Sequence, residues 1–411
     1  MGKTINMGRL GPDVLCGPVP AGDVRAAGAE PVQPRAGSAH GLAAPLALVR
    51  AVVLRDWRSL LVTLVTCAVA AVVTAFQYQV YTSFVRAGAV GPSYIGGTVW
   101  VGAGSIECFD FPGIIGEDYA GLLARHFPDA RVRRVAFGFA EWTSPTGNRG
   151  NVAVIGLDGA TADDGTPLAD KTFVAEASDL ARLDLSGATG EVATLGGQTM
   201  MLGGTTDRLP TFLGAPYVVT GFEQARTILR MEPGSTAFLV LDNQTQSAPL
   251  LDAALDEARA RYPELLLSSQ AQFAQSSSRY WQRKTGAGSA ILLAAVLASL
   301  LMMILLANGV SRFLQRYSQD LLSMLGHGGG EREVWLVAGG IALVVAGVTL
   351  TAMMLLTPLM IAVARPLFPW VFFVPADALI PALAVLASLG VAIVGARSAV
   401  RQFGPEAVFR T

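Results

Sequence analysis

Four long stretches of the chain consist almost entirely of apolar residues, and this is the dominant pattern of the sequence. A helix that crosses a bilayer needs about 20 such residues, because its backbone polar groups must be satisfied within the helix. Each stretch is long enough and carries no charge in its interior. We therefore predict four transmembrane helices, at residues 59–80, 288–308, 334–364 and 377–397. The third contains Pro358, so we expect it to be tilted or kinked.

Arginines beside these stretches predict how the chain is oriented. Lys and Arg collect on the cytoplasmic side of membrane spans. Arginines lie before the first stretch, between the second and third, and after the fourth: Arg50, Arg55, Arg58, Arg312, Arg316, Arg332, Arg397, Arg401 and Arg410. We therefore expect a multi-pass membrane protein with both termini in the cytoplasm. Residues 81–287 and the short loop 365–376 would lie outside.

The segments on the cytoplasmic side differ in character. Residues 1–43 are rich in Gly, Ala and Pro and are predicted to form a disordered tail. Residues 44–58 place apolar side chains at helical spacing beside arginines, which indicates an amphipathic helix at the inner membrane surface. Residues 309–333 form a loop between the second and third spans, and residues 398–411 form a C-terminal tail.

The insert of residues 81–287 is long enough for a domain with its own core. Short runs rich in β-branched and aromatic residues alternate with Gly-rich turns, which predicts an α+β fold. The expected strands are residues 98–101, 131–137, 151–155, 216–220 and 237–241. One helix should begin at Pro249. A second, at residues 271–283, runs without a breaker toward the second span, so we predict a continuous helical stalk.

Composition excludes two classes of function. Hydrophobic residues make up 52% of the 411 residues and charged residues 15%, and the net charge of -1 provides no basic field for nucleic acid. No phosphate-binding G-x-x-x-x-G-K-[ST] motif is present, and lysine occurs only at Lys3, Lys171 and Lys284. The chain is therefore not expected to hydrolyse ATP by itself.

No catalytic or metal-binding constellation stands out in the sequence. The three histidines are far apart and have no metal-ligand spacing, and the three cysteines are not expected to pair. Asp110, Glu117 and Asp118 are close in sequence, and we interpret them as a solvated loop rather than as an acid and base pair. We predict that this chain is not an enzyme and binds no cofactor.

One long outer domain after the first span, followed by three closely spaced spans, resembles the topology of MacB/FtsX-type ABC transporter permeases. Two cytoplasmic segments add to this resemblance. Residues 312–335 (RFLQRYSQDLLSMLGHGGGEREVW) are similar to the coupling segment of that family, and residues 400–411 (VRQFGPEAVFRT) to its C-terminal ending. Residues 273–292 and 137–159 are most similar to the DevC-type, glycolipid-exporter-associated group.

The resemblance implies the permease subunit of an exporter. ATP hydrolysis in a separate ABC ATPase subunit would move the extracytoplasmic domain and export a lipid-like or amphiphilic substrate. The implied partners are a second copy of the chain, a periplasmic adaptor, an outer-membrane channel and membrane lipid. By resemblance, the residues that would contact the ATPase are Arg316, Leu321, Leu322, Leu325 and Gly326.

A second function remains open from the sequence. Some relatives of this family do not transport a substrate and instead use the same movement to activate an extracytoplasmic hydrolase or sensor. The sequence separates export from signalling poorly, and similarity to the glycolipid-export group favours export.

Overall fold

The computed structural model describes residues 49–402, except residues 52–53, 56, 128, 213, 243–247 and 318–330. The predicted N-terminal tail therefore lies outside the described residues. So do residues 403–411 and the centre of the loop between the second and third spans.

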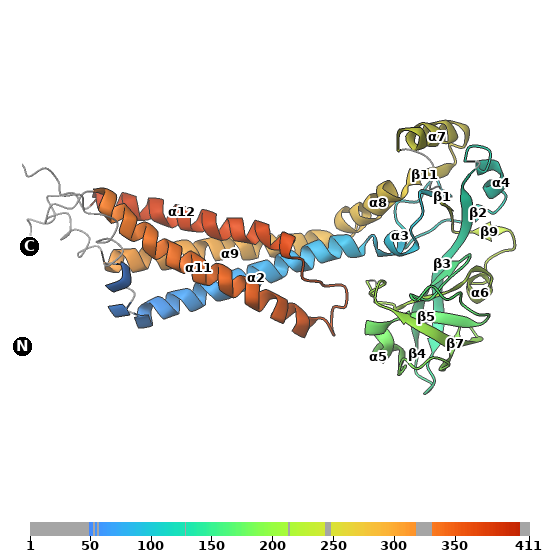
Figure 1. The fold of residues 1–411 in the computed structure, drawn as a ribbon, viewed down its shortest axis with the longest axis horizontal. Helices are drawn as coiled ribbons and strands as arrows, with labels where there is room; N and C mark the ends of the chain where they lie inside the picture. Colours follow the sequence, from blue (N-terminus) through green and yellow to red (C-terminus); the bar gives the residue numbers. More distant parts are fainter. Residues whose placement is uncertain are drawn as a thin grey trace, which may run out of the picture. The chain divides into compact units, whose positions relative to one another are not determined.

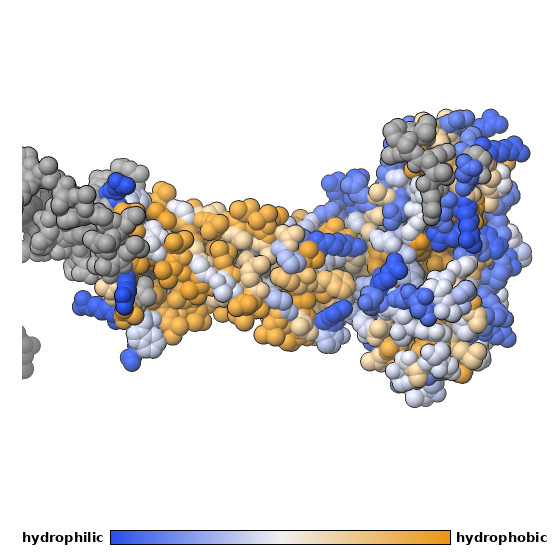
Figure 2. Space-filling view, viewed as in Figure 1, coloured by the Kyte–Doolittle hydropathy of each residue, from blue (hydrophilic) through white to orange (hydrophobic). Residues whose placement is uncertain are grey.

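Four of the described helices are long and apolar enough to cross a membrane, which confirms the predicted class of fold. They are α2 (Trp57–Ala87), α9 (Gly286–Arg316), α11 (Glu331–Ala364) and α12 (Leu379–Gln402). Large apolar side chains on their outer faces are exposed, including Leu343 and Val363, each 73% exposed. Figure 2 shows this apolar surface in orange along the helices. A surface of this extent and composition suits lipid rather than water.

The four helices pack through small and apolar side chains. Helix α2 contacts α9 and α11, and α12 contacts α9 and α11 (Figure 1). Ala71 and Ala75 are buried in the core of this bundle, and the hydroxyl of Thr74 donates a hydrogen bond to the carbonyl of Ala298 at 3.1 Å. Small residues permit such close approach between membrane helices. Helix α11 continues through Pro358.

A domain rich in β-sheet is inserted between α2 and α9, as predicted. Its main sheet has nine strands in the order β11-β1-β10-β3-β4-β8-β5-β7-β6. Their bounds are β1 (Val99–Ala103), β3 (Arg131–Thr143), β4 (Arg149–Leu157), β5 (Thr172–Glu176), β6 (Val192–Leu195), β7 (Gln198–Thr206), β8 (Tyr217–Gly221), β10 (Phe238–Asp242) and β11 (Leu265–Ser269). Strands β2 (Ile115–Gly116) and β9 (Ser235–Thr236) form a separate pair.

Helices cover parts of this sheet. They are α3 (Val90–Ile95), α4 (Tyr119–Leu123), α5 (Leu180–Leu183), α6 (Phe222–Ile228), α7 (Ala248–Arg261) and α8 (Gln270–Arg283). Helix α7 is the one predicted from Pro249, and Leu255 and Ala258 on its inner face are fully buried. The strands β4 and β8 pair in parallel, as do β5 and β7, whereas the other pairs are antiparallel. The sheet is therefore mixed.

The two membrane helices α2 and α9 connect to the outer domain in different ways. Helix α2 runs without interruption to Ala87, beyond the predicted end of the first span at residue 80. Helix α8 ends at Arg283 and α9 begins at Gly286, so the predicted continuous stalk into the second span is wrong. The hydroxyl of Thr285 donates to the carbonyl of Trp281 at 2.6 Å, a bond between residues four apart that often bends a helix.

Glycine at position 288 permits the turn between α8 and α9. A Cβ atom there would lie 2.6 Å from the Cα of Gln282, closer than real contacts allow. We expect Gly288→Ala to destabilise the chain by about 1–3 kcal/mol because the backbone must shift. Gly286→Ala, which meets nothing within 4 Å, should be neutral or stabilising by up to about 1 kcal/mol. Thermal unfolding of both purified variants in detergent measures the difference, and equal unfolding temperatures would contradict this account of the turn.

Candidate functional site

A buried carboxyl group joins three parts of the outer domain. Asp110 lies in the loop between β1 and β2 and is 4% exposed. Its carboxylate accepts a hydrogen bond from the indole N–H of Trp281 in α8 at 2.8 Å and another from the hydroxyl of Tyr217 in β8 at 3.0 Å. The loop, the α8 helix and the centre of the sheet are therefore held to one side chain.

The environment of Asp110 changes its acidity. Burial raises the pKa of the carboxyl from 3.8 to about 6, and the hydrogen bonds from Trp281 and Tyr217 oppose this shift. Burial, followed by the nearby Asp110 charge, raises the pKa of Tyr217 well above its ordinary value. Asp110 can therefore change charge near neutral pH while it remains inside the domain.

The interpretation of these acidic residues as one solvated loop is wrong for two of the three. Asp110 is buried, and Glu117 pairs with Arg134, with 3.0 Å between Oε2 and Nη1. Only Asp118 is exposed. A signal for the burial of Asp110 is present in the sequence, since the residue stands between Phe109 and Phe111, but an acidic residue between two aromatic ones is not specific by itself.

Aromatic side chains from four separate segments meet beside Asp110. We define the aromatic cluster as Phe84 of α2, Phe212 of the loop after β7, Trp281 of α8 and Trp370 of the linker between α11 and α12. The ring centroids of Phe212 lie 5.1 Å from Phe84, 5.1 Å from Trp281 and 6.3 Å from Trp370. Such pairs stabilise packing beyond the area they bury. The cluster connects the outer domain to α2 and to the linker between α11 and α12.

The linker between α11 and α12 is hydrogen-bonded along α2. The side-chain amide of Gln79 donates to the carbonyl of Val374 at 2.8 Å and accepts from its N–H at 3.1 Å. One helical turn further, Ser83 makes the same pair of bonds with Phe372, at 3.2 and 3.1 Å. Gln79 and Ser83 are four residues apart and therefore share one face of α2. Each side chain bonds to both the N–H and the carbonyl of one linker residue, as the backbone of a neighbouring strand would. This linker was predicted only as a short loop.

The end of α2 is also tied to α8. The buried hydroxyl of Ser277 donates to the carbonyl of Gly88 at 2.5 Å and accepts from the N–H of Phe109 at 3.3 Å. A Cβ atom at Gly88 would lie 3.0 Å from the ring of Trp281, so glycine lets the two helices approach. Further along the linker, Arg86 pairs with Asp377 at 2.7 Å. We call this set of contacts between α2, α8, the linker and Asp110 the junction.

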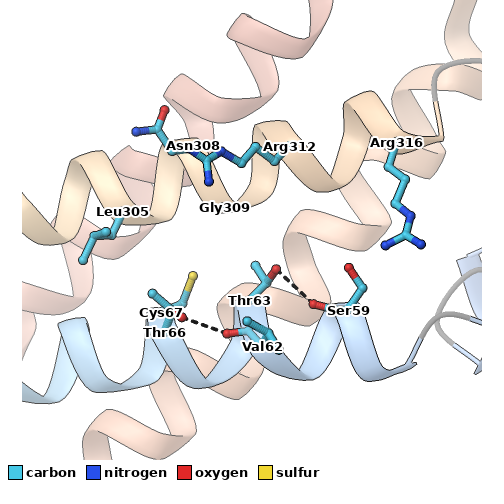
Figure 3. A pocket seen from close by; sticks show the side chains of 10 residues that line it. All are labelled: Ser59, Val62, Thr63, Thr66, Cys67, Leu305, Asn308, Gly309, Arg312 and Arg316. Carbon is cyan, nitrogen blue, oxygen red and sulfur yellow. Dashed lines mark hydrogen bonds between the residues drawn. The ribbon is translucent and has the colours of Figure 1, made fainter.

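One of the five predicted ATPase-contact residues lies within the described chain, at the opposite end of α9. Arg316 occupies its last turn. The other four, Leu321, Leu322, Leu325 and Gly326, lie outside the described residues. Arg316 and Arg312 line a groove of about 510 Å³ between α9 and α2 (Figure 3). In the described part of the chain, no group of three or more His, Cys, Asp and Glu residues could hold a metal ion.

Comparison with known proteins gives a partial similarity of fold. No family model matches the chain, and no curated protein matches it. The periplasmic region of MacB from Actinobacillus actinomycetemcomitans is similar over 44% of this chain and 92% of its own, with 6% identity and a TM-score of 0.33. The extracellular domain of the noncanonic ABC-type transporter YknZ from Gram-positive bacteria is similar over 42% of this chain and 99% of its own, with 12% identity and a TM-score of 0.31. Both TM-scores are below 0.5.

We expect Asp110 to make stability depend on pH. Because its pKa is higher in the folded chain, the folded state holds a proton between pH 3.8 and about 6 that the unfolded state releases. Stability should therefore fall as pH rises through this window and level off above it, by about 2–3 kcal/mol in total. Asp110→Asn should lose this dependence. Thermal unfolding of wild type and of Asp110→Asn between pH 4 and 8 measures this pH dependence as the difference in stability between the two proteins.

The control for Asp110 is the exposed carboxyl nearby. Asp118→Asn should follow the wild-type pH curve. Glu176, whose pKa burial raises to about 7, titrates in all three proteins and cancels in the differences. Parallel curves for wild type and Asp110→Asn would contradict the assigned role of Asp110.

Gln79 provides a test of the linker contacts. Gln79→Leu leaves the N–H of Val374 without its partner, which we expect to cost about 1–3 kcal/mol. The carbonyl of Val374 loses one of two hydrogen bonds and keeps the one from the N–H of Asp377 at 3.0 Å. Gln77, two residues earlier on the same helix, makes no hydrogen bond to the linker among the residues that the structure describes, so Gln77→Leu should cost little. Limited proteolysis of residues 365–374 in the full chain checks the result. Faster cleavage in Gln79→Leu alone is expected, and equal rates in both variants would contradict it.

Proposed function

We propose that the chain is the permease subunit of an ABC-type exporter of the MacB/FtsX kind. The topology supports this, because a large domain lies between the first and second of four apolar helices. The likeness of residues 312–335 and 400–411 to the coupling segment and ending of that family adds to it. The chain has no nucleotide-binding motif, so ATP would be bound and hydrolysed by a separate ATPase subunit.

The observation that carries this proposal is the unbroken course of α2. One helix runs from Trp57 through the membrane to Ala87, where the junction holds it to α8 and to the linker. A displacement at one end of such a helix reaches the other end with little loss, since each turn is hydrogen-bonded to the next. In the proposed mechanism, the ATPase pushes on residues 321–326, which follow α9 in the sequence. The packing of α9 on α2 carries that movement to the outer domain.

The turn at Lys284 and Thr285 gives α8 a separate part in this mechanism. Because α8 and α9 are distinct helices, α9 can move in the membrane while α8 remains bonded to the sheet through Trp281 and Asp110. A few residues at the end of an element are enough to absorb such a change. The outer domain would then swing with α2 about this turn.

The assembly that we propose follows the family. Two copies would associate with two ATPase subunits in the bacterial inner membrane, with both termini in the cytoplasm. A periplasmic adaptor and an outer-membrane channel would complete the export route for a lipid-like or amphiphilic substrate. The likeness of residues 273–292 to the DevC-type group is the reason for placing the chain nearest to that group.

Co-purification tests the ATPase contact. We expect the tagged chain, extracted in mild detergent without crosslinking, to retain a P-loop ATPase. Leu322→Asp should reduce that recovery at least about tenfold, because a buried charge at an apolar contact costs several kcal/mol. Ser323→Asp is the matched control, since it adds the same charge to the neighbouring position and should retain the ATPase.

The partners that are recovered distinguish the two functions. A P-loop ATPase together with a periplasmic adaptor would support export, whereas an ATPase together with a hydrolase or sensor would support signalling. Recovery of no ATPase, or equal recovery with both variants, would overturn the proposed coupling.

A further inference from the structure

The groove between α2 and α9 is polar although both of its walls are membrane helices. Hydroxyl groups of Ser59, Thr63 and Thr66 line it from α2, and Asn308, Arg312 and Arg316 line it from α9 (Figure 3). Gly309 lets the walls approach, since a Cβ there would lie 3.2 Å from Thr63. Polar groups at membrane depth are costly and mark functional positions more often than packing positions.

The groove lies at the depth of lipid headgroups. The apolar part of α2 begins at Trp57 and that of α9 ends at Arg312, so the groove spans the end of both membrane segments. It is open to the lipid side, because Val62 on its wall is 69% exposed. A molecule held there would have its polar part between the helices and its apolar part along the exposed side chains of α2.

The charges in the groove favour an anion. Neither α2 nor α9 contains an acidic residue, so neither helix supplies a counter-charge for Arg312. Arg312 is exposed, and among the residues that the structure describes it has no hydrogen-bond or ion-pair partner. In Figure 3 the side chain of Arg316 points from α9 toward Ser59 on α2. A guanidinium group binds phosphate oxygens in a bidentate manner.

The hydroxyls on α2 complement the arginines. Thr63 and Thr66 donate to the carbonyls of Ser59 and Val62, at 3.3 and 2.9 Å, so their protons are already used. Each oxygen still has a lone pair and can accept a hydrogen bond. The groove thus combines cationic donors on α9 with neutral acceptors on α2. A phosphate that carries a hydroxyl-bearing headgroup satisfies both.

We propose that this groove is a binding site for an anionic phospholipid with hydroxyl groups in its headgroup, such as phosphatidylglycerol. The phosphate would bind the exposed guanidinium of Arg312, with Arg316 as a second positive charge on the same wall. The headgroup hydroxyls would donate to Thr63 and Thr66, and the acyl chains would follow α2 past Val62. This inference rests on the membrane placement of α2 and α9 and not on export, so it can fail or hold independently of the proposed function.

Native mass spectrometry of the full chain, without the ATPase, tests the lipid site. We expect saturable retention of phosphatidylglycerol and much weaker retention of phosphatidylcholine. The double variant Arg312→Gln with Arg316→Gln should lower the apparent affinity for phosphatidylglycerol about 30-fold, from about fivefold per arginine near the membrane surface. The double variant Arg279→Gln with Arg283→Gln removes the same charge from α8 and should leave retention unchanged.

A second pair of variants tests the headgroup contact without changing charge. Thr63→Val with Thr66→Val should weaken phosphatidylglycerol binding several-fold and leave the binding of phosphatidic acid, which has no headgroup hydroxyl, unchanged. Circular dichroism of each variant checks that it is folded. Equal retention of the neutral and anionic lipids, or retention that survives loss of both arginines, would overturn the proposal. Displacement of the lipid by millimolar inorganic phosphate would also overturn it, in favour of a free-anion site.

Discussion

The two hydrogen bonds accepted by Asp110 hold together parts of the chain that would otherwise separate. Trp281 reaches the carboxylate from the helix that precedes the second span, and Tyr217 reaches it from the centre of the sheet. A buried carboxyl is tolerated only where such donors satisfy it. The position of α8 on the sheet therefore depends on this group, and so does the place where the aromatic cluster can form around Trp281.

The junction explains why two neighbouring helices connect to the outer domain differently. Helix α2 is free to continue past the membrane because its outer side chains, Gln79 and Ser83, bond to the linker and not to water. Helix α8 is bonded to the sheet and to Gly88, so its axis is set by the domain and not by α9. The turn at Thr285 reconciles the two directions.

The sequence predicts the elements whose physical cause is local. Apolar runs of membrane length identified the four long helices, and the five predicted strands appear as β1, β3, β4, β8 and β10, because each is rich in β-branched or aromatic residues. Strand β7 was missed, since its Gly203 and Gly204 interrupt any alternation. The break before α9 was missed because no proline marks it. The backbone approaches itself closely there, since a Cβ atom at Gly288 would lie 2.6 Å from the Cα of Gln282.

The candidate sites differ in predictability for a related reason. The junction consists of contacts between residues up to 295 positions apart, such as Gln79 with Val374, and one sequence contains no signal for such pairs.

At the junction end of α2 the polar groups are satisfied by the protein itself. At the other end, Arg312 stands without a protein partner among the described residues, in a groove open to lipid. Polar groups that find hydrogen-bond partners within the protein stabilise its fold. Polar groups without such partners at membrane depth favour the binding of another molecule. The two ends of α2 and α9 therefore differ: near the junction the chain satisfies its own polar groups, whereas at the other end Arg312 is left open to a molecule from outside the chain.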